Sequence, residues 1–169
     1  MKTFDLRSIR VRSGEEHREA IELQLSPLEY GGQRYVPVPE VVPAELAIAR
    51  ASTGTVFGLR FRTQLHGPCY RCLEDAVLDV GVNAREYQAT NPGDEEELRT
   101  PYLEDSKLDV QAWARDAIAL DLPEQILCRP DCAGLCPVCG KDLNLEPHTH
   151  DEDTTDPRWE ALAKLRDEL

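Results

Sequence analysis

The chain has 169 residues, enough for one domain or for one domain with a small appendage. Its 32 acidic residues outnumber its 19 basic residues, which gives a net charge of −13 at pH 7. Such a surface repels a phosphate backbone unless the basic groups are tightly segregated, so the composition disfavours general nucleic-acid affinity and favours a basic partner.

Apolar runs in the sequence are short. No stretch approaches the ~18 apolar residues of a membrane-spanning helix, and the charged N-terminus lacks the apolar run of a signal peptide. We therefore expect a cytoplasmic protein. Cytosolic thiols are kept reduced, so the six cysteines indicate metal binding rather than disulfides.

Residues 1–90 predict a β-rich N-terminal part. A short strand is expected at residues 3–6, within the only locally basic arm of the chain. Ile21, Leu23 and Leu25 then alternate with polar residues, which is the period of a strand with one face in water. Prolines at positions 37, 39 and 43 predict an irregular or edge connection over residues 34–43.

The same alternation predicts a hairpin in the middle of this part. Leu46 and Ile48 precede a turn at residues 52–54, and apolar residues alternate with polar ones again over 57–65. A further alternating run follows at residues 76–82. Strands separated by such short turns indicate an antiparallel sheet that curls or is covered on one side.

The remainder of the chain predicts loops and helices. Residues 91–107 contain four consecutive acidic residues and predict an acidic exposed loop. A helix is expected to begin near Asp109 and to end before Pro123, and Asp156-Pro157 predicts the start of a terminal helix. Residues 108–169 would thus carry a helix, a zinc-binding Cys/His segment and the terminal helix. We predict an α+β fold in one co-folded domain, with a curled antiparallel β-sheet and a packed helix.

All six cysteines and two of the four histidines occur in short-spaced pairs. The pairs are Cys69-x2-Cys72, Cys128-x3-Cys132, Cys136-x2-Cys139 and His148-x-His150. Structural zinc takes four thiolate or imidazole ligands in a tetrahedron, commonly as two short-spaced pairs. Eight ligands are the number that two closed sites require.

We predict that these pairs form two structural zinc sites. One site would use Cys136, Cys139, His148 and His150. The other would use Cys69, Cys72, Cys128 and Cys132, and would clamp the C-terminal segment to the β region. Two alternatives stay open. In one, the four cysteines between 128 and 139 surround a single ion, which leaves the other ligands for a second; in the other, one zinc binds and the remaining residues are spectators.

Several features argue against catalysis. A closed tetrahedral site leaves no open position for water. The sequence has no glycine-rich phosphate loop and no Ser/His/Asp signature, and no βαβ pattern surrounds a Cys-x-x-Cys pair as it would in a thiol oxidoreductase. We therefore expect neither an enzyme nor a small-molecule substrate.

The cysteine motifs and the segments around them resemble the YceD family, also called large ribosomal RNA subunit accumulation proteins. The resemblance covers about the C-terminal two-thirds of the chain. It rests, in matching order, on residues 69–74 (CYRCLE), 117–120 (AIAL), 122–123 (LP), 127–128 (LC), 131–132 (DC), 134–140 (GLCPVCG), 142–144 (DLN) and 156–159 (DPRW). Many family members carry Cys-x-Cys where this chain has His148-Thr149-His150, and that exchange preserves the capacity to bind zinc.

The resemblance implies a cytosolic, non-catalytic protein needed for accumulation of 23S ribosomal RNA and assembly of the large subunit. The acidic composition adds a hypothesis for the mechanism, in which the protein shields a basic ribosomal protein before delivery to the pre-ribosomal large subunit. The alternative is a zinc-dependent RNA-binding module that contacts pre-ribosomal RNA through the arginines of the N-terminal arm and through Arg60 and Arg62.

Overall fold

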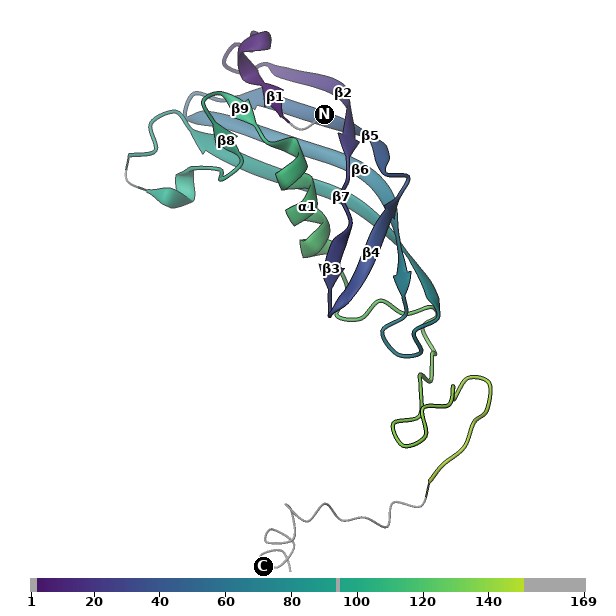
Figure 1. Ribbon diagram of the computed structural model, residues 1–169. Coiled ribbons are helices and arrows are strands. Elements are labelled where there is room, and N and C mark those ends of the chain that lie inside the picture. The colour runs from purple at the N-terminus through teal and green to yellow at the C-terminus, as the bar shows by residue number, and fades with distance from the viewer. Residues whose placement is uncertain (1–2, 94, 151–169) are drawn as a thin grey trace, which may run out of the picture. The chain divides into compact units, whose positions relative to one another are not determined.

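The computed structural model describes residues 3–93 and 95–150 (Figure 1). The chain divides into two compact units, Met1–Cys132 and Ala133–Leu169. The first unit is mostly an antiparallel sheet with one α-helix, as the α+β prediction requires. The expected terminal helix at residues 156–169 lies outside the described residues.

The main sheet is built from six antiparallel strands of the first unit. Its order is β2-β5-β6-β4-β3, and β7 pairs with the other edge of β6. The strands are β2 (Glu16–Gln24), β3 (Leu28–Tyr30), β4 (Gln33–Val38), β5 (Val41–Arg50), β6 (Gly54–Pro68) and β7 (Asp75–Ala89).

The sheet follows a meander of four long runs, because two of the runs are bent rather than broken. Strands β2 and β3 form one run, and β4 and β5 form the next, which lies along a single edge of β6. At the bend, the amide of Leu25 donates to the carbonyl oxygen of Glu40 at 2.8 Å. The turn between these two runs uses Gly31 and Gly32, which have φ values of 58° and 78° that favour glycine.

The prediction of an irregular or edge connection over residues 34–43 is wrong in part, because most of that stretch lies in the regular strands β4 and β5, although its residues pair on one side only. Pro37 lies in β4, opposite Leu65 of β6, and Pro43 lies in β5, opposite Glu22 of β2. Both prolines are tolerated because each sits where pairing is one-sided: β3 pairs with β4 only as far as Tyr35, and β6 pairs with β5 only from Ala44 onward.

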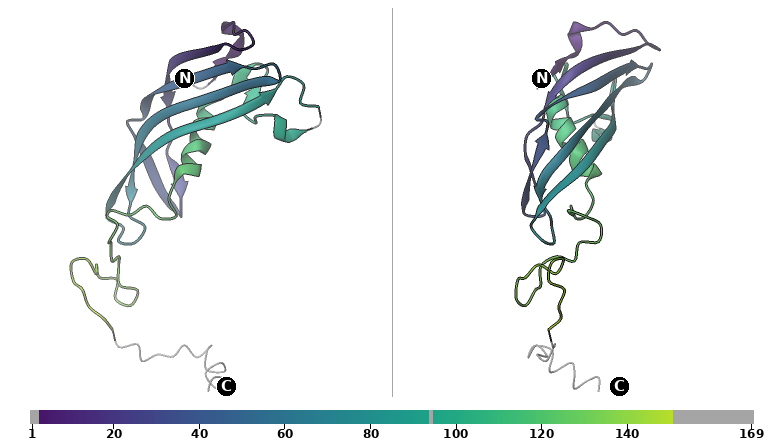
Figure 2. Two further views of the ribbon diagram at one scale, coloured as in Figure 1. Left: turned by 180° about the vertical axis from the view of Figure 1, so that it is seen from behind. Right: turned by 90° about the vertical axis from the view of Figure 1, so that its right-hand side faces the viewer.

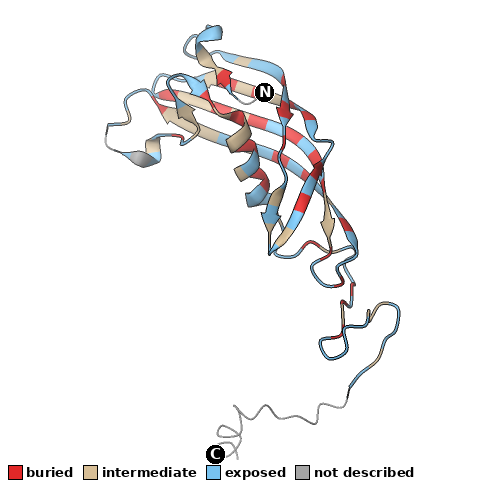
Figure 3. Cartoon of the chain, viewed as in Figure 1, coloured by how far each residue is buried: buried red, intermediate tan, exposed pale blue. Residues whose placement is uncertain are grey.

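The predicted hairpin is confirmed. Strands β5 and β6 pair in a register that sets Leu46 opposite Leu59 and Ile48 opposite Phe57. Strand β7 then pairs with β6 along the full length of both strands. Buried and exposed positions alternate along these strands, so one face of the sheet builds the core (Figure 3).

The acidic loop is partly structured, which the sequence did not predict. It contains the 3-10 turn η2 (Glu96–Leu98) and the strand β8 (Leu103–Glu104), and it ends in β9 (Lys107–Leu108). Strand β9 pairs with β8 and also with β1 (Phe4–Asp5), which confirms the short N-terminal strand. A second 3-10 turn, η1 (Leu6–Ser8), follows β1.

Helix α1 (Val110–Asp121) lies where the sequence predicted a helix. Asp109 caps it, and the carboxylate accepts a hydrogen bond from the amide of Ala112 at 2.9 Å. Its buried side chains are Val110, Trp113, Ala114, Ala117 and Ile118. The helix contacts β7 and β2, the two outer strands of the meander, so the sheet curls around it without those strands pairing (Figure 2). Within the described residues, no helix has the length and apolar character needed to cross a membrane.

Candidate metal centres

The first cysteine pair lies in the turn that joins β6 to β7. Within this turn, the amide of Cys69 donates to the carbonyl oxygen of Glu74 at 2.7 Å, and the amide of Leu73 donates to that of Cys69 at 3.0 Å. Leu73 has a φ of 65°, which lets the chain reverse immediately after Cys72. The turn buries both thiols at the end of the sheet.

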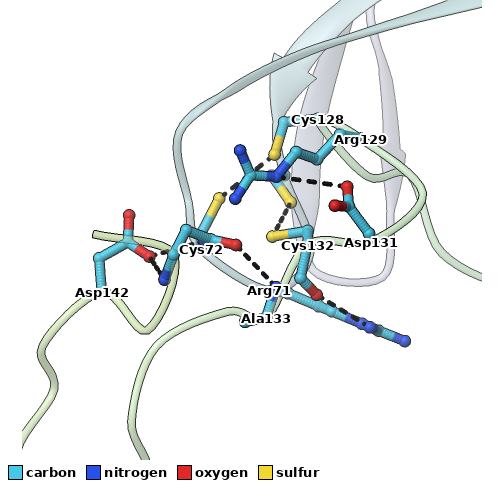
Figure 4. Close-up of polar contacts among 10 residues, drawn as sticks. Arg71, Cys72, Cys128, Arg129, Asp131, Cys132, Ala133 and Asp142 are labelled. Carbon is cyan, nitrogen blue, oxygen red and sulfur yellow. Dashed lines mark hydrogen bonds and ion pairs between the residues drawn. The ribbon is translucent and has the colours of Figure 1, made fainter. Parts of the chain in front are cut away.

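The second cysteine pair follows α1 and meets the first. The amide of Tyr70 donates to the carbonyl oxygen of Ile126 at 2.8 Å, which brings residues 126–132 alongside the β6–β7 turn. Arg71 adds a second bridge, because its Nη1 donates to the carbonyl oxygen of Cys132 at 3.0 Å (Figure 4). The structure therefore joins two pairs that are more than fifty residues apart in the sequence.

The four sulfur atoms of this four-cysteine cluster have the spacing of metal ligands. The Sγ–Sγ distance is 3.8 Å between Cys69 and Cys132 and 3.6 Å between Cys72 and Cys128, and all four lie within 4.8 Å of one another. A disulfide would bring two sulfurs to about 2.0 Å. Four sulfurs held about 2.3 Å from one tetrahedral ion lie about 3.8 Å apart. The cluster fits a closed tetrahedral metal site.

The cluster mixes a stabilised thiolate with a disfavoured one. Burial raises the pKa of Cys72 to about 12. Burial acts in the same direction on Cys69, but backbone N–H groups, chiefly those of Cys72 and Cys128, outweigh it and lower the pKa of Cys69 to about 6. A divalent cation would offset the cost of burying further thiolates here, since metal ligation deprotonates a thiol.

The second cluster lies wholly within residues 133–150. An isolated bridge between Leu135 and Asp142 closes a tight loop, in which the amide of Cys136 donates to the carbonyl oxygen of Lys141 at 2.8 Å. Gly140 has a φ of 73°, a left-handed conformation that favours glycine directly after the second cysteine of Cys136-x2-Cys139. The amide of Cys139 is the main cause that lowers the pKa of Cys136 to about 6.

Two histidines complete this cysteine–histidine cluster. His148 Nε2 lies 3.1 Å from Cys139 Sγ, and His150 Nε2 lies 3.4 Å from the same sulfur. His148 Nδ1 faces the carbonyl oxygen of Glu146 at 2.7 Å, an arrangement that orients an imidazole ligand through its second nitrogen. The ligand atoms of Cys136, Cys139, His148 and His150 all lie within 4.8 Å of one another.

The structure thus gathers the eight residues into the two groups of the first pairing, and not into the group that would place Cys128, Cys132, Cys136 and Cys139 around one ion. Both clusters can hold a metal ion, whereas the identity of the ion and the ligand roles stay predictions. The sequence interpretation missed the bridging role of Arg71. The only indication was an arginine inside a Cys-x-x-Cys motif, and its partner is 61 residues away.

The part of the chain that matches a known protein family contains both cysteine clusters. Residues 57–166, which include every member of both clusters, match the model of the family described as Large ribosomal RNA subunit accumulation protein YceD. The chain belongs to the YceD family. This finding confirms the resemblance carried by the Cys-x-x-Cys segments and their surroundings.

Relatives of this YceD chain occur in bacteria and in a plant. Uncharacterized proteins of Mycobacterium tuberculosis and Mycobacterium bovis are 34% identical over 127 residues, which cover 72% of this chain and 60% of each relative. The uncharacterized protein YlbN of Bacillus subtilis is 27% identical over 153 residues, 89% of this chain and 87% of YlbN. A maize protein named Large ribosomal RNA subunit accumulation protein YCED homolog 1, chloroplastic, is 26% identical over 114 residues, 49% of this chain and 39% of its own. No solved structure matches the chain.

Proposed function

We propose that this YceD protein is a cytoplasmic, non-catalytic factor in biogenesis of the large ribosomal subunit, which supports 23S ribosomal RNA accumulation by binding a basic ribosomal protein. The name of the family supports the link to large-subunit RNA. The choice of partner depends on one observation, the uneven distribution of charge. Residues 91–169 contain 20 acidic and 8 basic residues, whereas residues 1–90 contain 12 and 11.

Several of these carboxylates are available to a cationic partner. The side chains of Glu104, Asp121 and Glu124 are exposed, and none of them forms an ion pair with a described residue. Unpaired surface carboxylates attract a basic protein and accelerate its association at low salt. The basic tails and loops of a ribosomal protein would be shielded until the protein meets RNA.

In this proposal, the four-cysteine cluster and the cysteine–histidine cluster are structural metal sites that stabilise the fold. We propose that zinc is held by Cys69, Cys72, Cys128 and Cys132 in one site and by Cys136, Cys139, His148 and His150 in the other. Four protein ligands in each site leave no position for a reacting water, which agrees with a non-catalytic role. Zinc supplies on the order of 10–16 kcal/mol of apparent binding free energy, enough to hold the ligand segments of each cluster together within its own unit.

The test is direct binding of the zinc-loaded full chain to purified basic large-subunit ribosomal proteins, followed by calorimetry at about 0.05 M and 0.3 M salt. We expect binding that weakens steeply with salt, because exposed charges are screened beyond about 10 Å at 0.1 M. A triple variant, Glu104→Gln, Asp121→Asn and Glu124→Gln, should weaken binding at least several-fold without lowering zinc content. Absence of binding to every such protein at low salt would refute the proposed partner.

A further inference from the structure

The face of the sheet opposite α1 carries no helix within the described part of the chain (Figure 2). Residues directly opposite each other in antiparallel strands project from the same face, so the strand registers define rows of side chains across this outer face. One row runs across all four strands of the meander. It consists of Arg18 on β2, Ala47 on β5, Gly58 on β6 and Arg85 on β7.

The neighbouring rows continue the pattern. Two residues further along β6, Arg60 lies between Glu45 and Asn83, and two residues beyond that, Arg62 lies opposite Gly81. Strand spacing is about 4.8 Å, so Arg18 and Arg85 flank a strip about 14 Å wide with small residues at its centre. Four arginines therefore surround a low floor on the uncovered face.

This face is hollowed. Two adjoining hollows, of about 260 and 360 Å³, share Arg60 and Asn83. We name them together the arginine trough; its lining residues are Glu16, Arg18, Glu45, Ala47, Ala49, Val56, Gly58, Arg60, Phe61, Arg62, Gly81, Val82, Asn83 and Arg85. A Cβ atom at Gly81 would meet nothing within 4 Å, and one at Gly58 would meet only Ala47 Cβ at 3.5 Å. Packing therefore does not require glycine at either position, and their absence of side chains keeps the floor open.

The trough has more positive charge than its own carboxylates neutralise. Arg18 pairs with Glu16 and lies 3.5 Å from Glu45, which is also 3.9 Å from Arg60. The side chains of Arg62 and Arg85 are exposed, and neither forms a hydrogen bond or ion pair with a described residue. Two other carboxylates on this face, those of Glu22 and Asp79, lie outside the lining, and Asp79 accepts a hydrogen bond from Gln64.

We propose that the arginine trough binds the phosphate backbone of RNA. Guanidinium groups bind phosphate oxygens through paired N–H donors, and two of the four are free to do so. Phe61 is the only aromatic residue of the lining and is 5% exposed, so the trough offers no platform on which bases could stack. The contacts are therefore to the backbone and do not read sequence.

The choice of RNA among polyanions rests on the proposed function, because the family is named for accumulation of large-subunit RNA. The net charge of −13 does not oppose it, since the excess negative charge lies in residues 91–169 and not in the strands that form the trough. Each phosphate contact to a single strand contributes about −0.7 to the slope of log affinity against log salt, so contacts from the two free arginines predict a slope of about −1.4.

The test is fluorescence anisotropy of a labelled single-stranded 23S ribosomal RNA fragment with the zinc-loaded full chain at about 0.05 M and 0.15 M salt. The double variant Arg62→Glu/Arg85→Glu should bind at least tenfold more weakly. The control Arg99→Glu/Arg115→Glu changes the net charge by the same amount outside the trough and should bind within about threefold of the wild type. Gly81→Arg adds a cation to the open floor and should bind several-fold more tightly.

Three results would contradict RNA binding by the arginine trough. They are no RNA binding at low salt, equal losses of RNA affinity in the two double variants, and displacement of the RNA by polyglutamate as readily as by unlabelled RNA. Circular dichroism melts confirm that the variants fold. The ribosomal-protein assay separates the two proposals, because Arg62→Glu/Arg85→Glu should retain the basic protein. A wild-type chain that binds a ribosomal protein but no RNA would refute only the RNA site in the trough. A wild-type chain that binds no ribosomal protein would refute the proposed function.

Discussion

Arg71 and Cys132 are joined by a hydrogen bond of 3.0 Å from the guanidinium Nη1 to the backbone carbonyl oxygen. Arg71 also donates from Nε to Gln125 Oε1 at 3.3 Å. The side chain belongs to the β6–β7 turn, and both acceptors belong to the segment after α1. The two halves of the four-cysteine cluster are thus held together by contacts that use no sulfur, in addition to any shared metal ion.

Removing this bridge should weaken metal binding at one site only. Arg71→Ala leaves all eight candidate ligands in place, and loss of such a supporting contact typically lowers metal affinity 10- to 100-fold. We expect that drop for one of the two ions, measured by zinc competition with a chelating dye. Arg115→Ala is the control, because Arg115 and Asp116 form an exposed pair at 2.9 Å of little energetic value on helix α1. Equal affinity of Arg71→Ala and the wild type would contradict the bridging role.

The two clusters should hold two zinc ions independently. They share no ligand, and each lies within one compact unit. Cys72→Ser should reduce the zinc content from about two ions per chain to about one, and so should His148→Ala, because a structural site needs all four ligands. Elemental analysis of the purified full chain measures this. The independence would be disproved if either single substitution removed both ions.

Gly67 marks a close contact between β6 and β4. A Cβ atom there would lie 2.8 Å from the carbonyl oxygen of Arg34 and would also overlap the ring of Tyr35, which is 1% exposed. Gly67→Ala should therefore destabilise the fold by about 1–3 kcal/mol, as overpacking does. Gly81→Ala, where nothing lies within 4 Å, should be neutral or slightly stabilising. Urea denaturation of the zinc-loaded chain compares the two, and similar losses in both would be contrary to the predicted clash.

Tyr102 should make the stability depend on alkaline pH. Burial, with the nearby Asp116 carboxylate that accepts from the hydroxyl at 3.2 Å, raises the pKa of Tyr102 to about 12. The phenol of an unfolded chain ionises near pH 10, so the unfolded state loses its proton first. The stabilising contribution is therefore complete below about pH 10 and is lost as the pH rises toward 12.

Urea midpoints between pH 9 and pH 12 test this expectation in the wild type and in Tyr102→Phe. The variant loses the hydroxyl but keeps the ring that stacks on Trp113 at a centroid distance of 6.2 Å. Its stability should fall less steeply over this range than that of the wild type. Parallel curves for the two proteins would assign the alkaline loss to other groups.

Most of the regular structure could be predicted from local patterns. The alternation of Ile21 and Leu23, and of Phe57 and Leu59, indicates a strand face because successive side chains point to opposite sides. The spacing from Val110 to Ile118 indicates a helix for a similar reason. The prolines of β4 and β5 misled the interpretation, because proline is excluded only where a neighbour needs its N–H, and that depends on the pairing.

In the candidate metal sites, too, local spacing predicted part of the arrangement and tertiary contacts decided the rest. Short spacing predicts that Cys69 and Cys72 act together, since two intervening residues turn both thiols to one side, and the same holds for Cys136 and Cys139. Spacing does not decide which pairs share an ion, and the sequence left two other arrangements open. The hydrogen bond from Tyr70 to Ile126 brings the two distant pairs of the four-cysteine cluster together.

The sequence by itself determined the period of each element, the excess of negative charge in residues 91–169 and the supply of eight soft ligands, because all three depend on residue type and local spacing. The tertiary structure alone decided the partners: β9 with β1, Arg71 with Cys132, and the row from Arg18 to Arg85. Such contacts form between residues far apart in the chain, and their geometry follows from strand register and packing, which no local pattern specifies.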